Sequence, residues 1–253
     1  MNKPYTLKKS LGQHFLHDEP MCRKIVDQLA YDEGKRVLEI GPGGGALSKY
    51  LVAIPGIDYK AVEIDEEKFH YLEATFPAIK GKIILKDILQ AELPYEENFS
   101  VIGNFPYNIS SPIMFKMLEW EGQVDEIIGM FQKEVAQRIA AGPGSKMYGI
   151  LSVLTQAYFE VTYLFDVPPG SFTPPPKVMS GVVRFVNIRN PHQIESFKKF
   201  KLLVKTAFGQ RRKTLRNALR SILPPSALTD PLMDKRAEQL SVADFIYLYR
   251  TFL

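Results

Sequence analysis

Residues 36–45 have the sequence RVLEIGPGGG, in which a short apolar run leads directly into a cluster of glycines. The apolar run predicts a buried β-strand, and residues 46–53, which follow the glycines, predict a helix. A strand, a glycine-rich turn and a helix form the phosphate- or nucleotide-binding unit of doubly wound α/β folds. Glycines permit the tight turn and let backbone N–H groups approach a ligand. We therefore predict an α/β fold with a doubly wound, Rossmann-like sheet.

The next predicted strand, residues 59–64, carries an acidic side chain near its end. Glu63 follows the glycines by about twenty positions, the spacing at which dinucleotide-binding proteins place an acceptor for a ribose diol. Residues 41–46, GPGGGA, also fit the dinucleotide pattern, so the class of nucleotide stays open at this point. The spacing favours a ribose ligand over the alternative, a solvated charge at a strand end.

Two more strand ends carry polar side chains. Residues 83–85 predict a strand that is followed by Asp87, and a strand that ends at Gly103 is followed by Asn104. Successive strand ends of a parallel sheet meet in one cleft, so we expect the glycine turn, Glu63, Asp87 and Asn104 to lie together. An Asp at this edge can accept a hydrogen bond from an adenine amine, although alone it would be an ordinary loop acid.

Residues 101–110, VIGNFPYNIS, have the composition of a site that holds a nucleic-acid base. The exocyclic amine of adenine is a poor nucleophile. Two fixed acceptors, the Asn104 side-chain oxygen and the Phe105 carbonyl, would help its nitrogen become tetrahedral. Pro106 fixes the chain direction, and Tyr107 can stack on an extruded base. The alternative is a turn in which the Asn caps, the Pro stiffens and the Tyr packs.

The remaining segments complete the predicted catalytic part. Residues 11–16 are interpreted as an arm too short and irregular to be an element, and Asp18 and Pro20 mark the start of a helix. Residues 168–177 form a stiff, proline-rich loop that either presents Phe172 to the cleft or buries it in the core. Helices are predicted at residues 112–120, 133–141 and 150–157, a strand at 125–131, and a final strand pair at 159–167 and 178–188.

The composition excludes several classes of protein. The chain has 253 residues, of which 24% are charged and 45% hydrophobic, as in an ordinary soluble globular protein. Cys22 is the single cysteine, which excludes a disulfide framework and a thiolate metal site. The N-terminus is polar and basic without an apolar signal region, and no stretch has the length of a membrane span. We expect a cytoplasmic protein.

The formal net charge of +4 conceals strong clustering. Residues 195–220 contain nine Lys or Arg against the single acid Glu195. Mixed charges would suffice for a solvated face, so a surface for a phosphate backbone is the favoured interpretation. We place a domain boundary between residues 190 and 191, because the pattern after it is helical without strand-like runs. The predicted domains are residues 1–190 and residues 191–253.

Five blocks of the sequence together resemble the bacterial ribosomal RNA adenine dimethyltransferases. They are LGQHFL at 11–16, EIGPG at 39–43, GNFPYNIS at 103–110, FTPPPKV at 172–178 and QRRKT at 210–214. The resemblance implies a class I S-adenosylmethionine-dependent methyltransferase fold with a small all-helical C-terminal domain. It also implies methyl transfer to N6 of two adjacent adenines near the 3′ end of 16S ribosomal RNA. The setting would be the small subunit during ribosome assembly, and we expect a monomer that uses no metal.

The resemblance also implies a role for individual residues. His14 stands where the family commonly has Asn, and Phe105 replaces the usual Leu while preserving the backbone carbonyl. S-adenosylmethionine would be bound by His14, Leu16, Gly41, Gly43, Glu63, Asp87 and Asn104, with Glu63 on the ribose and Asp87 on the adenine. The catalytic residues would be Asn104, Phe105, Pro106, Tyr107 and Phe172, and the RNA would be bound by Lys8, Lys9, Arg211, Arg212, Lys213 and Arg216.

Three alternative functions compete with this interpretation. Related resistance methyltransferases modify large-subunit RNA, but the basic block at residues 210–217 looks like that of the small-subunit group. An RNA-binding assembly factor with incidental catalysis would not need Asn104 to bind subunits. A nicotinamide oxidoreductase, suggested by the glycine turn alone, leaves the segment from Asn104 to Tyr107 unexplained.

Overall fold

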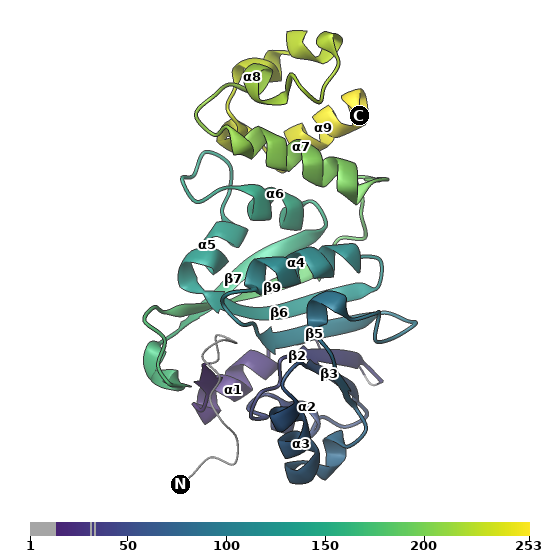
Figure 1. Cartoon of the computed structure of the whole chain (residues 1–253), viewed down its shortest axis with the longest axis vertical. Helices are drawn as coiled ribbons and strands as arrows, with labels where there is room; N and C mark the ends of the chain where they lie inside the picture. The colour runs from purple at the N-terminus through teal and green to yellow at the C-terminus, as the bar shows by residue number, and fades with distance from the viewer. Residues whose placement is uncertain (1–13, 31, 33) are drawn as a thin grey trace. The chain divides into compact units, whose positions relative to one another are not determined.

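The computed structural model describes residues 14–30, 32 and 34–253 (Figure 1). By their contacts the residues divide into two compact units. The first comprises Met1–Ala136 and Thr162–Val186, and the second comprises Gln137–Val161 and Asn187–Leu253. The domain boundary that the sequence pattern predicts between residues 190 and 191 stays a prediction.

A mixed sheet forms the framework of the first unit, and in the described part of the chain its order is β4-β3-β2-β5-β6-β9-β7. The strands from β4 to β6 run parallel, and β9 pairs antiparallel with β6. The predicted doubly wound α/β fold and the predicted neighbouring position of the last two strands are confirmed. The bounds are β2 Arg36–Ile40, β3 Asp58–Glu63, β4 Ile83–Leu85, β5 Phe99–Asn104, β6 Val124–Gln132, β7 Phe159–Val167 and β9 Ser180–Asn187.

The first helix of the catalytic part begins where the sequence places its cap. Asp18 accepts a hydrogen bond from the Met21 N–H, 3.1 Å away, and so caps this helix. The helix predicted over residues 46–53 is shorter than expected, because residues 43–47 are held in turns. The bounds are α1 Glu19–Val26, α2 Ser48–Leu51, α3 Glu66–Thr75, α4 Ser110–Glu119 and α5 Lys133–Ala140, with 3₁₀ turns η2 Pro77–Ile79, η3 Ile88–Gln90 and η4 Pro169–Ser171.

The prediction that residues 11–16 contain no regular element was wrong for the last two. Strand β1, Phe15–Leu16, pairs antiparallel with β8, Phe172–Thr173. The His17 N–H donates to the Ser171 carbonyl at 2.9 Å, and the Ser171 hydroxyl donates to the Asp18 carboxylate at 2.8 Å. Local sequence could not reveal this pairing, since the partner strand lies far along the chain.

The second unit is built mainly from helices. Buried apolar side chains of α7, such as Phe200 and Leu203, recur at helical spacing, as do Phe245 and Leu248 of α9. The bounds are α6 Ile150–Gln156, α7 Phe197–Gly209, α8 Leu215–Leu219 and α9 Val242–Phe252, with 3₁₀ turns η5 Pro225–Thr229, η6 Pro231–Asp234 and η7 Ala237–Gln239. None of the helices in the described part of the chain has the length and hydropathy needed to span a bilayer.

Gly103 occupies a crowded position near the carboxyl end of β5. A Cβ atom there would lie 2.6 Å from the Ile40 carbonyl oxygen and 2.8 Å from the Phe105 ring. Gly129 pairs with Gly103 across β5 and β6, and a Cβ added at Gly129 would also lie 2.8 Å from the Phe105 ring. The two glycines therefore make the space that the Phe105 ring fills behind the strand end.

Replacing Gly103 by Ala should destabilise the protein, because a backbone carbonyl cannot move aside as a flexible side chain can. Overpacking of this kind costs about 1–3 kcal/mol, which corresponds to a fall in Tm of about 2–4 °C for each kcal/mol. Calorimetric unfolding of Gly103→Ala measures the change. Gly122→Ala is the matched control, since a Cβ at Gly122 meets no atom within 4 Å. Equal Tm values for the two variants would show that the strand end has room for a side chain.

Candidate active site

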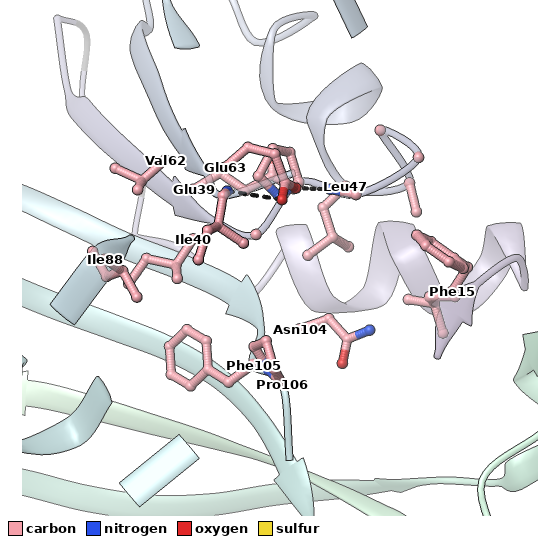
Figure 2. A pocket seen from close by; sticks show the side chains of 18 of the residues that line it. Phe15, Glu39, Ile40, Leu47, Val62, Glu63, Ile88, Asn104, Phe105 and Pro106 are labelled. Carbon is pink, nitrogen blue, oxygen red and sulfur yellow. Dashed lines mark hydrogen bonds between the residues drawn. The ribbon is translucent and has the colours of Figure 1, made fainter. Parts of the chain in front are cut away.

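A cavity of about 480 Å³ lies at the carboxyl ends of the parallel strands. Its walls come from β1, the glycine turn after β2, the end of β3, the segment after β4 and the segment after β5. Figure 2 shows Glu39 and Glu63 on one side and Asn104, Phe105 and Pro106 on another. The volume falls within the range of small-molecule sites, so the cavity can hold a nucleoside-sized group.

Glu63 is held rigidly by backbone donors. Its Oε1 accepts from the N–H groups of Ile64 and Asp65, both at 2.9 Å, and its Oε2 accepts from the Gly43 N–H at 3.1 Å. Burial raises the pKa of the Glu63 carboxyl, and the hydrogen bonds from Asp65 and Gly43 counteract that rise. With φ of +57°, Gly43 supplies the backbone conformation that brings its N–H to the carboxylate.

Asp87 lies at the corresponding position after β4. Its Oδ1 accepts from the Leu89 N–H at 2.9 Å and so caps the turn η3. The side chain is half-buried and lines the cavity together with Ile88 and Leu89. Asp87 thus lines the cavity beside two apolar residues, an arrangement suited to a flat ring that carries an amine.

The Asn104 side chain has a defined orientation. Its Nδ2 donates to the His14 backbone carbonyl at 2.9 Å. A carbonyl oxygen only accepts, so the amide nitrogen must face His14 and the Oδ1 must face away. Within the described part of the chain no group donates to this Oδ1 or to the Phe105 carbonyl. Both predicted acceptor groups therefore lie at the strand end without a hydrogen-bond donor among the described residues.

The residues after Asn104 have distinct environments. Phe105 is 0% exposed as a whole residue, and its ring packs edge-to-face against Phe131 at 5.2 Å between centroids, so the ring belongs to the core. The Tyr107 hydroxyl lies 2.6 Å from the Ser180 Oγ, and burial raises the pKa of this phenol. The Tyr107 ring stacks on the His14 ring at 5.4 Å with an interplanar angle of 29°.

His14 is fixed by three contacts. Besides its carbonyl and its stacked ring, its Nδ1 lies 2.8 Å from the Pro174 carbonyl oxygen. Because that oxygen can only accept, the Nδ1 must carry the proton. The imidazole therefore connects the segment before β1 with the proline-rich loop after β8, and it covers one face of Tyr107.

The structure brings most of the predicted site residues together. Those that line the cavity are His14, Leu16, Gly41, Gly43, Glu63, Asp87, Asn104, Phe105, Pro106 and Tyr107. Phe172 does not line it: its side chain is 2% exposed and belongs to the buried apolar cluster. The burial of Phe172 in the core agrees with the alternative considered for the proline-rich loop, and a contact of its ring with a base stays a prediction. Lys8 and Lys9 lie outside the described residues.

Sequence reasoning missed Glu39, which lines the same cavity. Its Oε2 accepts from the Ser48 hydroxyl at 2.6 Å and from the Tyr59 hydroxyl at 2.7 Å. Burial raises the pKa of the Glu39 carboxyl to about 7, and the two hydrogen bonds counteract the rise. The available signal was an acidic residue inside an otherwise apolar strand, which is rarely buried without a partner.

The predicted RNA-binding residues of the second unit differ in their surroundings. The Arg211 guanidinium donates to the carbonyls of Lys146 and Tyr148 at 2.8 and 3.2 Å. Arg216 donates to the Asp234 carboxylate at 2.6 Å, whereas Arg212 and Lys213 are exposed in the loop between α7 and α8. Arg211 thus has a structural partner, and Arg212 and Lys213 are better placed for a phosphate.

Fold and site together define a class I methyltransferase. The structure is similar to a solved dimethyladenosine transferase from Plasmodium falciparum, with a TM-score of 0.79 and 24% identity over 93% of this chain and 96% of that one. It is also similar to the 23S rRNA methyltransferase ErmE, with a TM-score of 0.69 and 23% identity over 94% of this chain and 100% of that one. At these identities the likeness concerns the fold.

The chain belongs to the ribosomal RNA adenine dimethylase family, whose model matches residues 5–252. It is 51% identical to the ribosomal RNA small subunit methyltransferase A of Cytophaga hutchinsonii, over 95% of each chain. It is 50% identical to the protein of the same name from Flavobacterium johnsoniae, over 95% of this chain and 94% of that one. The protein is therefore an enzyme, a methyltransferase of ribosomal RNA adenine, as the resemblance of its sequence blocks implied.

Arg211→Ala should lower the stability of the protein, because two backbone carbonyls lose a charged donor. Such hydrogen bonds contribute about 1.5–3 kcal/mol each where water cannot replace them, and less here, since the guanidinium is partly exposed. Arg212→Ala, one residue away in the exposed loop, is the control. Chemical denaturation should separate the two variants by about 1 kcal/mol or more, and indistinguishable midpoints would show that these Arg211 hydrogen bonds contribute nothing.

Proposed function

We propose that this enzyme transfers methyl groups from S-adenosylmethionine to N6 of two adjacent adenines near the 3′ end of 16S ribosomal RNA. The RNA would be presented by the small ribosomal subunit during assembly. The observation that carries the proposal is the fixed orientation of Asn104, whose Oδ1 faces away from His14 at the same cavity that Glu63 and Asp87 line. The names of the relatives that share about half of the sequence support the choice of subunit.

The residues that line the cavity are suited to binding S-adenosylmethionine. Glu63 offers carboxylate oxygens to a ribose diol, and Asp87 offers an oxygen to an adenine amine beside the apolar Ile88 and Leu89. Gly41 and Gly43 let the backbone approach the ligand, and His14 and Leu16 cover it from the N-terminal segment. When bound, S-adenosylmethionine supplies an electrophilic methyl group. The residues of the protein hold and orient the cofactor and exclude water from it.

Asn104 and Phe105 act on the target amine. In the first transfer the Asn104 Oδ1 and the Phe105 carbonyl oxygen each accept one N–H of the adenine amine, which frees its lone pair from conjugation with the ring. In the second transfer the methylated amine keeps one N–H, which one of these two oxygens accepts. These bonds strengthen as the nitrogen becomes tetrahedral, so they favour the transition state over the ground state. Pro106 keeps the carbonyl in place, and the Tyr107 ring offers its surface for stacking. The proton that the nitrogen loses passes to solvent.

RNA binding would fall mainly on exposed cations of residues 191–253, which we propose as the RNA-binding domain. Arg212 and Lys213 are the central candidates, with Arg216 and Arg211 partly engaged in hydrogen bonds of their own. A phosphate surface of this kind gives affinity without sequence specificity, so the choice of base falls to the cavity. Further exposed cations of this domain are Lys198, Lys199, Lys205 and Arg220. The N-terminal Lys8 and Lys9 would add phosphate contacts.

Incubating the enzyme with labelled S-adenosylmethionine and unmethylated subunits tests the proposal. Label in two adjacent adenines of small subunits, as dimethyladenosine, is the expected result. Label confined to large subunits would favour the resistance-type alternative. Normal growth with an Asn104→Ala protein that still binds subunits would favour an assembly factor whose catalysis is incidental.

Glu63→Ala should weaken S-adenosylmethionine binding by at least about tenfold, because charge-assisted hydrogen bonds to a diol contribute roughly 1.5–3 kcal/mol each. Titration calorimetry measures the affinity. Glu63→Gln is the matched variant, since it keeps the shape and one acceptor, and it should bind more tightly than Glu63→Ala. An affinity of Glu63→Ala equal to that of the wild type would remove Glu63 from the cofactor site.

Replacing Arg212 and Lys213 together by Ala should flatten the salt dependence of subunit binding. Each phosphate that the protein no longer neutralises reduces the slope of log K against log salt by about 0.7–0.9, so the pair should change it by about 1.5. Arg211 is kept to preserve its hydrogen bonds with residues 146 and 148. Cofactor affinity serves as the control and should not change. An unchanged slope would indicate that other cations contact the phosphates, with Lys3, Lys8 and Lys9 as the first candidates.

A further inference from the structure

Lys68 is a fully buried lysine beside the cavity. It lies in the first turn of α3 with its side chain 0% exposed. Leu72, one turn later, is also buried, so Lys68 occupies a position on the inner face of the helix where an apolar side chain is expected. A buried ammonium group has a high desolvation cost, and natural proteins keep such a conflict with local rules chiefly where function requires it.

The contacts of Lys68 lead to the cofactor acid. Its Nζ donates to the Asp65 Oδ2, and the Asp65 backbone N–H donates to the Glu63 Oε1 at 2.9 Å. The Asp65 Oδ1 accepts from the Glu67 N–H at 3.2 Å and caps α3. The Nζ also lies 5.4 Å from the centre of the Phe15 ring, which lines the cavity. The ammonium is thus connected to Glu63 through Asp65 and lies beside the N-terminal segment.

Lys68 is one of the groups that influence the charge of Glu63. Burial raises the pKa of Glu63, and after two backbone hydrogen bonds the Lys68 ammonium is the next largest influence that lowers it. Its effect exceeds the opposite effect of the Asp65 carboxylate. Glu39 is a further buried acid of the same wall. The other charged or titratable side chains that line the cavity are His14, His17, Glu19, Lys49, Tyr71, Lys86, Asp87 and Tyr107.

We propose that Lys68 is a positioning residue for the cofactor: its buried ammonium keeps the Glu63 carboxylate ionised and directed at the ribose diol. The inference rests on the proposed use of Glu63 as ribose ligand. An Asp65–Lys68 pair that served the fold alone would influence stability but not the protonation of Glu63. A neutral side chain at residue 68 would remove the lowering influence of the ammonium, so Glu63 would protonate at a higher pH.

The test is the affinity for S-adenosylhomocysteine, the product form of the cofactor, measured by calorimetry from about pH 5.5 to 9, a range that spans shifted carboxyl pKa values. Binding requires ionised Glu63, so affinity is full above the pKa of Glu63 and falls as the pH drops through it. Lys68→Gln keeps a donor for Asp65 without the charge. Its affinity should fall at a higher pH than that of the wild type and recover above that pH.

Two further variants make the result specific. Lys68→Arg keeps the charge and should retain the pH profile of the wild type. Lys68→Gln should cause no shift in the pH profile when residue 63 is already Gln. This comparison separates Glu63 from Glu39, whose pKa of about 7 places its own titration in the same range. If Lys68→Gln does not fold, Lys68→Met takes its place, both alone and combined with Glu63→Gln.

An identical pH profile for Lys68→Gln and the wild type would overturn the inference while leaving the proposed function intact. A shift that persists in the double variant would overturn it as well, because another group would then be titrating. Failure of the wild type to bind S-adenosylhomocysteine at any pH would instead contradict the proposed function.

Discussion

The hydrogen bond from the Asn104 Nδ2 to the His14 carbonyl is the contact on which the site depends. An asparagine amide could present either its donor or its acceptor to a base, and only the acceptor helps an amine to attack. Since a backbone carbonyl accepts and never donates, His14 decides the choice. Gly103 brings the chain to this point, and the buried Phe105 ring keeps it there.

The N-terminal segment therefore takes part in both the cofactor side and the substrate side of the site. Pairing of β1 with β8 and the contact of His14 with Pro174 hold this segment in place. The Phe15 ring packs against Gly43, where an added Cβ would lie 2.9 Å from it. The same few residues thus cover the glycine turn of the cofactor side and orient the acceptor of the substrate side. A substitution in this segment should therefore affect both the cofactor side and the substrate side.

Much of the site could be predicted because a parallel sheet converts order in the sequence into proximity in space. Glu63, Asp87 and Asn104 follow successive strands, so their meeting required only the fold class. The pairing of β1 with β8 and the burial of Phe172 depend on residues far apart in the sequence, and no local pattern encodes them. The partners of Glu39, Lys68 and Arg211 likewise come from tertiary packing. A charged residue looks the same in sequence whether it faces solvent, a buried acid or a backbone carbonyl.

The decisive experiment for Asn104 is single-turnover methylation of small subunits by Asn104→Asp and Asn104→Ala, at saturating cofactor and substrate. Asp keeps an acceptor of nearly the same shape but cannot donate to the His14 carbonyl, so it should lose the orienting bond. Both variants should be slower than the wild type by on the order of 10²–10³, with cofactor and subunit affinities changed far less. An Asp variant that methylates at nearly the wild-type rate would show that orientation by His14 is not required. An Ala variant at the normal rate would show that Asn104 serves binding alone, and the mechanism would have to be abandoned.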